Sequence, residues 1–141
     1  MFLAGVRIME KQKLSLGKQD RLCHHKLISR LFKEGAAYHA WPINLIWLGE
    51  VNAENPPAQV MFAVPKRNFK HANKRNLLRR RMKEAYRQLK PEFYQHLEQH
   101  SQQGVFAFVY IGNVSLEYKL IQDKIILLLQ RLKEVHEKAA R

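Results

Sequence analysis

The sequence has little cysteine, few acidic residues and no long apolar run. Cys23 is the single cysteine among 141 residues, which excludes an internal disulfide framework and a multi-cysteine zinc site and is typical of a reducing compartment. The longest apolar runs, such as Val105 to Ile111, are too short to cross a bilayer. The N-terminus lacks the apolar stretch of a secretory signal, and it contains Lys11, Lys13 and Lys18. These absences predict a soluble, cytoplasmic protein.

The residue patterns of common active sites are also missing. The acids are scattered without a close pair suited to general acid–base catalysis, and no nucleophile elbow, phosphate-binding loop or dinucleotide fingerprint is present. His24 and His25 are adjacent and point to different sides of a helix, and the seven histidines lack the cysteine or carboxylate spacing of a metal site. Cys23 is either a reactive thiol or, as we expect, a small packing residue. We therefore expect no catalytic residue and no metal ligand in this chain.

Basic residues outnumber acidic ones, and most of the excess lies in one segment. The chain has 25 lysines and arginines against 12 acids, a net charge of +13. Residues 66–90 contain eleven basic residues and one acid, Glu84, so this segment carries ten of the thirteen net charges. A solvated helix face normally alternates in sign to gain ion pairs between residues i and i+4, and this segment barely does. It is therefore predicted to bind a polyanion, with nucleic acid the leading candidate and an anionic membrane surface the second.

Three segments have the composition of β-strands. They are Ile43 to Val51, Val60 to Val64, which Pro65 closes, and Val105 to Ile111. The third is apolar at every position, so we expect it to lie in the centre of a sheet, covered on at least part of both faces. The asparagines and prolines of residues 52–57 predict a turn between the first two strands.

Three further segments have helical periodicity. The first is Leu22 to Lys33, with Gly35 as its C-terminal stop, and the second runs from about Asn73 to Leu89. Ser115 is expected to cap the third, with Glu117 in its first turn. The apolar side of the first helix consists of Leu27, Ile28, Leu31 and Phe32, and that of the third of Leu120, Ile121, Ile125, Leu128, Leu132 and Val135.

The order of these elements suggests an α+β or an α/β sandwich in which helices cover a small central sheet, and we expect the α+β class. We expect one RNA-binding domain over residues 1–141, with a flexible arm at 1–18 and a folded core at 19–135. The basic helix has a core side and a cationic side at 100° per residue. The core side consists of Leu78, Met82, Ala85, Tyr86 and Leu89, and the cationic side of Asn76, Arg79, Arg80, Lys83 and Arg87, with Arg75 at its edge.

The basic segment resembles the arginine-rich signature of the bacterial ribonuclease P protein subunit family. The matching residues are the run VPKRN at 64–68, Ala72, and the run KRNLLRRRMKEAYR at 74–87. Upstream, LFKEG at 31–35 is similar to the end of the family's first helix, and the later elements occur in the family's order. The resemblance covers roughly residues 20–135. The sequence departs from the pattern at Leu77, where a basic residue is usual, and by one extra residue between Arg67 and Ala72.

The resemblance implies a fold and a function. The fold is an α–β sandwich in which a left-handed βαβ crossover carries the basic helix. The protein is the small partner of a catalytic RNA, expected at 1:1, and together they remove the 5′ leader of precursor tRNA as an RNA endonuclease. The RNA and its bound Mg²⁺ carry out the hydrolysis, while the protein screens phosphate repulsion and holds the leader. Neither a membrane nor an obligate protein partner is implied.

The resemblance also assigns roles to residues. Those expected to bind RNA are Lys66, Arg67, Lys74, Arg75, Asn76, Arg79, Arg80, Lys83 and Arg87. The family's leader cleft lies between the first helix and a sheet face and is lined by aromatic rings, on which bases of any identity can stack. The corresponding residues are Ile28, which stands where the family commonly has Phe, Phe32 and Trp47. Phe32 is equally well explained as a core residue.

Two other classes of protein have the same composition. A ribosomal or other structural RNA-binding protein is the main alternative, because only the signature spacing and the element order argue against it. A helix bound to a membrane surface is a weaker one, since the core requires the apolar side of the basic helix.

Overall fold

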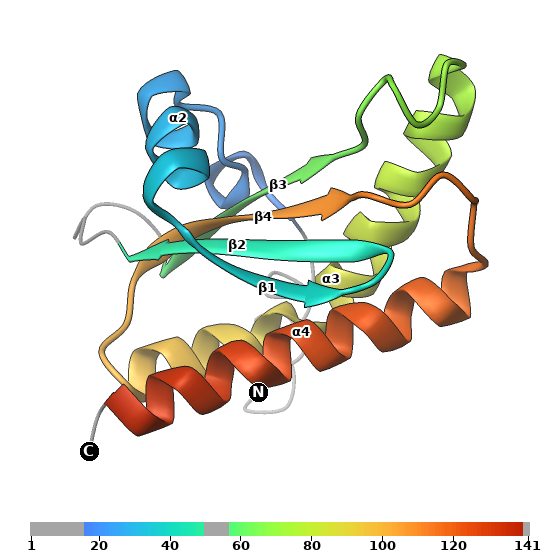
Figure 1. Cartoon of the computed structure of the whole chain (residues 1–141). Coiled ribbons are helices and arrows are strands. Elements are labelled where there is room, and N and C mark those ends of the chain that lie inside the picture. Colours follow the sequence, from blue (N-terminus) through green and yellow to red (C-terminus); the bar gives the residue numbers. More distant parts are fainter. Residues whose placement is uncertain (1–15, 50–56, 140–141) are drawn as a thin grey trace, which may run out of the picture.

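The computed structural model describes residues 16–49 and 57–139, and these form a four-stranded sheet with helices on both faces (Figure 1). The strand order is β1-β2-β4-β3; β2 is antiparallel to β1 and β4, and β3 is parallel to β4. The α+β prediction is confirmed, and the left-handedness of the crossover from β3 through α3 to β4 stays a prediction. The elements are η1 (Lys18–Asp20), α2 (His25–Glu34), β1 (Ala36–Ala40), β2 (Ile43–Gly49), β3 (Ala58–Ala63), α3 (Ala72–Gln99), β4 (Gly104–Tyr110) and α4 (Tyr118–Ala139).

Strand β4 lies inside the sheet, as its uniformly apolar sequence predicts. Its side chains alternate between the two faces, so that Phe106 and Phe108 pack toward α3 and α4 while Val105 and Ala107 pack toward α2. All four of these residues are buried. The sheet therefore has two apolar layers, a large one under the two long helices and a small one under α2, which has ten residues.

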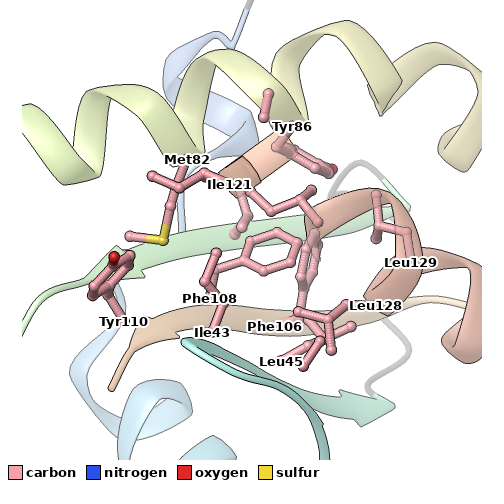
Figure 2. Packing of buried hydrophobic residues seen from close by; sticks show 14 of the residues in the cluster. Ile43, Leu45, Met82, Tyr86, Phe106, Phe108, Tyr110, Ile121, Leu128 and Leu129 are labelled. Atoms are coloured by element: carbon pink, nitrogen blue, oxygen red, sulfur yellow. The ribbon is translucent and has the colours of Figure 1, made fainter. Parts of the chain in front are cut away.

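The larger layer is built on aromatic rings (Figure 2). The ring of Phe106 lies 5.4 Å from that of Tyr86, 5.5 Å from Phe93 and 5.9 Å from Trp47, between centroids. Such tilted and edge-on pairs stabilise a core by about 0.5–1.5 kcal/mol each beyond the apolar area they bury. The core side predicted for the basic helix is confirmed, because Leu78, Met82, Ala85 and Tyr86 are buried and Leu89 is half-buried.

Several predicted boundaries are wrong. Helix α3 continues to Gln99 through Pro91, and the short edge strand β1 is not among the predicted strands. Helix α4 begins at Tyr118, so Ser115 does not cap it. Two residues placed on the apolar side of α4, Leu120 and Val135, are exposed, and Leu129 and His136 are buried there instead.

The ends of the first helix and of the expected arm also differ from prediction. Gly35 follows α2 with φ −67°, so it does not adopt the left-handed conformation of a glycine stop. Its lack of a side chain is needed for packing instead, because a Cβ would lie 2.6 Å from Cγ2 of Ile46 and against the carbonyl oxygen of Leu31. Leu16 is buried in the core, so the folded part includes residues of the predicted arm at 1–18. Residues 1–15 and the predicted strand end at Val51 lie outside the described residues.

A buried ion pair holds the segment before α2 against the long basic helix. The ammonium of Lys90 lies 2.9 Å from a carboxylate oxygen of Asp20, and both residues are buried. Asp20 also accepts hydrogen bonds from the backbone of Gly17 at 2.9 Å and from the Tyr94 hydroxyl at 2.7 Å. The following residues run along the outer edge of β3, where the amide of Leu22 donates to the carbonyl of Val60. This segment therefore becomes one wall of the surface described next.

Candidate nucleic-acid interface

The cationic side of α3 borders a groove of about 290 Å³. One wall carries the basic side chains Arg79, Arg80 and Lys83, and the opposite wall is the segment Arg21 to Cys23. The floor between them is largely apolar and consists of Leu16, Val60, Met61 and Phe62. A groove of this kind offers phosphate-binding cations beside a surface on which bases or sugars can pack.

A second hollow of about 530 Å³ lies at the N-terminus of α3. Its basic residues are Arg67, Lys70 and Lys74, and His71 and Asn113 complete part of its rim. His71 is the N-cap of α3 but makes no side-chain capping bond, and the first turn has no acidic residue. The positive end of the helix dipole therefore reinforces the lysines and the arginine, an arrangement that attracts phosphate.

Some predicted RNA-binding residues bind their own chain. The guanidinium of Arg75 donates to the carbonyls of Phe69 and Lys70, at 2.7 and 2.9 Å, and so fixes the turn before α3. Arg87 grips the carboxylate of Glu84 at 2.7 and 3.0 Å, and this pairing holds the pKa of Glu84 below its usual value.

Other signature residues remain oriented toward the cationic side. Asn76 accepts a hydrogen bond from Arg79 at 2.7 Å, which holds the arginine against the helix. Lys66 and Arg67 are exposed in the turn after β3, and Lys74 and Arg80 are exposed on α3. The structure thus brings Arg79, Arg80 and Lys83 to one groove and Arg67 and Lys74 to the neighbouring hollow.

The sheet face under α2 is only partly covered. Leu31 is the buried residue of α2, whereas Ile28 is half-buried and Phe32 is 47% exposed, so Phe32 is not a core residue. Across the same face, Asn44 of β2 and Ala63 of β3 both pair with Val109 of β4, and all three are half-buried. The result is an accessible strip of sheet on the side of the molecule that carries Phe32.

Trp47 is not part of this surface, and its assignment to the leader cleft is wrong. Its side chain lies on the opposite face of the sheet, 7% exposed, with its ring centroid 6.3 Å from that of Phe93. The physical reason is the two-residue period of a strand, which places Trp47 with the buried Ile43 and Leu45. The side chain of β2 that does pack under α2 next to this position is Ile46.

The structure adds residues to the interface that sequence reasoning missed. Arg21 and Cys23 line the groove from a segment without periodicity, and Cys23 is exposed, so it is not the packing residue we expected. Lys70 lies in the basic segment but outside the signature spacing, in the part of the chain with the extra residue. Lys70 could have been found from the sequence, because it is one of the basic residues counted in the segment 66–90. Arg21 lies outside that segment, so the charge count gave no indication of it.

Taken together, the fold and the two hollows define a class: an α+β protein with a four-stranded sheet between helices, in which basic side chains cluster along one side of α3. The family model described as Ribonuclease P matches residues 16–133, and the chain belongs to this family.

Similar proteins agree with this assignment. The chain is 37% identical over 83 residues to a ribonuclease P protein component of Chlorobium phaeobacteroides, and the match covers 57% of each chain. It is 26% identical over 109 residues to the protein component of Porphyromonas gingivalis, which covers 76% of this chain and 78% of the relative.

Solved structures share the fold. The RNase P protein of Thermotoga maritima in complex with 1-(4-fluorophenyl)-2-thiourea has a TM-score of 0.62 at 17% identity, covering 79% of this chain and 98% of that one. The Staphylococcus aureus RNase P protein has a TM-score of 0.57 at 17% identity, covering 81% of this chain and 95% of that one.

Among the described residues, no helix is long and apolar enough to span a membrane.

Proposed function

We propose that this chain is the protein subunit of a bacterial, cytoplasmic ribonuclease P and assists removal of the 5′ leader from precursor tRNA. In this role one copy binds one catalytic RNA through the cationic side of α3. The sheet face beside α2 holds the leader of the substrate. The observation that carries the proposal is that Arg79, Arg80 and Lys83, three residues of the family signature, line one groove.

The electrostatics of the groove suit an RNA partner. Arginine binds two phosphate oxygens at once through its planar guanidinium, and Arg79 is held in place by Asn76 before any ligand arrives. The neighbouring hollow at Arg67, Lys70 and Lys74 continues the same positive surface around the start of α3. A phosphate backbone following this surface would contact both hollows, and its affinity would depend strongly on salt.

The leader is assigned to the other accessible feature, the sheet face under α2. Phe32 offers an exposed ring there, and stacking on a ring tolerates any base. Asn44, whose side-chain oxygen lies 2.8 Å from Nδ1 of His39, adds a polar group to an otherwise apolar strip. This combination suits a single strand of variable sequence.

Mg²⁺ is assigned to the RNA rather than to this surface. Mg²⁺ takes oxygen ligands, and the one carboxylate in the basic segment, Glu84, is already bound by Arg87 and by Gln88. The residues of the interface do not fit a protein-held Mg²⁺. Their contribution is to reduce the repulsion between the phosphates of the two RNAs, so that less Mg²⁺ is needed for them to associate.

The test is reconstitution with a bacterial ribonuclease P RNA. At a low Mg²⁺ concentration, at which the RNA alone cleaves precursor tRNA slowly, we expect the purified protein to restore cleavage, and the protein without RNA to cleave nothing. If about five to eight phosphates are neutralised, the slope of log affinity against log salt is about −4 to −7. The double variant Arg79→Ala/Arg80→Ala is expected to flatten it by up to about two units.

A matched control separates the groove from general charge. Lys124→Ala/Lys138→Ala also removes two positive charges, but from α4, which lies on the other side of the sheet from α2 (Figure 1). This variant should leave the salt slope within about half a unit of the parent. Equal flattening by both double variants would show non-specific attraction. Tight RNA binding without any stimulation of cleavage would instead indicate a structural RNA-binding protein.

A further inference from the structure

Three histidines and a glutamate meet where the C-terminal ends of α3 and α4 lie side by side (Figure 1). His96 and His100 are four residues apart on α3 and share one side of the helix, and Glu137 faces them from α4. The potential ligand atoms of these three residues all lie within 4.8 Å of one another. His136 stacks on His96, with ring centroids 5.5 Å apart.

Two of the three imidazoles in this cluster, those of His96 and His136, have ring nitrogens without a hydrogen-bond partner. His96 and His136 are only 8% and 4% exposed. Nε2 of His96 and both ring nitrogens of His136 are buried without a hydrogen-bond partner. A buried polar group without a partner typically destabilises a fold, so such groups are rare unless they serve a ligand.

His100 is oriented in the way that metal-binding histidines are. Its Nδ1 lies 3.0 Å from the carbonyl oxygen of His96, so that Nδ1 carries the proton and donates it. The tautomer this bond selects leaves the lone pair on Nε2 as the ligand atom. Metal-binding histidines almost always donate their second ring N–H in this way, most often to a carboxylate or a backbone carbonyl.

The surrounding charges also favour a cation. Helix α3 ends at Gln99 and α4 at Ala139, so the negative ends of two helix dipoles point toward the cluster. Lys133, a positive side chain whose charge acts on His96, pairs with Glu92 at 3.5 Å.

We propose that His96, His100 and Glu137 form a binding site for a divalent transition-metal ion, Zn²⁺ in the first place. Two imidazoles and a carboxylate are a donor set that Zn²⁺ uses, with water in the fourth position. Mg²⁺ and Ca²⁺ are disfavoured because they take oxygen ligands. Ligand atoms around a tetrahedral zinc ion are about 3.4 Å apart, so the exposed Glu137 closes onto the two histidines when the ion binds.

The site would join the two long helices at their ends, away from the cationic groove. It is therefore independent of the proposed function, and it can be tested without RNA. The experiment uses untagged protein stripped of metal with a chelator, titrated with Zn²⁺ against a chromophoric competitor and with Co²⁺ by visible absorption. One equivalent is expected to bind with the spectrum of tetrahedral cobalt and to raise the melting temperature, whereas Mg²⁺ alone does neither.

The main variants are His100→Gln and Glu137→Gln, because these residues are half-buried and exposed and their replacement leaves the core intact. Each is expected to weaken Zn²⁺ at least about tenfold and to abolish the zinc-dependent rise in melting temperature. His25→Gln is the matched control, since His25 is an exposed histidine on α2 and is not part of the cluster. Unchanged affinity in both main variants, loss of affinity in the control, or no stoichiometric binding by the parent would each overturn the proposal.

Discussion

Replacing Asp20 by alanine is expected to destabilise this protein more than the loss of any surface ion pair. The change removes the carboxylate that accepts from Lys90, Gly17 and Tyr94 in a region where Asp20 and Lys90 are 8% and 4% exposed. The ammonium of Lys90 then stays buried without this carboxylate. Breaking such a pair by removing one partner costs about 3–5 kcal/mol in the free energy of unfolding.

The structure places the expected value near the lower limit. The ammonium of Lys90 lies 5.2 Å from the centre of the Tyr94 ring, and this cation–π contact survives in Asp20→Ala. We therefore expect a loss of about 3 kcal/mol. Lys90→Met should cost less, because Asp20 keeps two hydrogen-bond donors. The double variant Asp20→Asn/Lys90→Met removes both charges and should lie within about 1 kcal/mol of the parent.

Urea denaturation of the parent and the three variants measures these differences in the free energy of unfolding. Asp123→Ala is the control, because its ion pair with Lys119 is solvent-exposed, at 3.5 Å, and should change the free energy of unfolding by no more than about 0.5 kcal/mol. The reasoning is refuted if Asp20→Ala loses no more than the control, or if the double variant is as unstable as Asp20→Ala.

Two further predictions follow from exposure and close packing. Phe32→Ala should lower the affinity of the assembled holoenzyme for leader-bearing precursor about 5- to 150-fold, because stacking of one base contributes about 1–3 kcal/mol. Binding of mature tRNA, measured in a parallel titration, should stay unchanged. Because Phe32 is 47% exposed, the free energy of unfolding of this variant should fall by less than the loss of about 3–5 kcal/mol expected for a core phenylalanine. Equal losses of affinity for both RNAs would contradict the place of Phe32 in the leader site. Gly104→Ala should cost about 1–3 kcal/mol or more in urea denaturation, because its Cβ would lie 2.6 Å from the Trp47 ring. Gly49→Ala, whose Cβ comes no closer than 3.9 Å to Gln103, is the control and should cost less than half as much.

The parts of the fold that could be predicted are those in which one pattern dominates. The apolar run of β4 and the arc from Leu78 to Tyr86 lie where their periodicities place them. The edge strand β1 has the sequence AAYHA, which carries no alternating pattern. It could not be predicted, because its position is set by pairing with β2. The sequence did not predict that α3 extends past Pro91, because proline destabilises the interior of a helix. Burial of Phe93 and Leu97 on the same side of the helix overcomes this cost.

The candidate site was predictable in composition but not in geometry. The basic segment identifies the cationic side of α3, yet no local pattern shows that Arg75 is bound by carbonyls of the preceding turn. Trp47 illustrates a different limit, because alternation groups it with Ile43 and Leu45 without saying which helix covers that face. Likewise, the four-residue spacing of His96 and His100 is visible in the sequence, whereas Glu137 comes from another helix.

Helix α3 has one consequence that goes beyond the charges it carries. Its 28 residues make a continuous rod of about 42 Å. The C-terminal half, with Phe93 and Leu97, packs in the core against the sheet and α4, and the N-terminal half carries the signature arginines. A basic tail of the same composition would lose about 1–2 kcal/mol of backbone freedom per residue on binding. Here the spacing of the cations is set during folding. Their contacts with a polyanion therefore contribute to affinity with almost no loss of backbone entropy on binding.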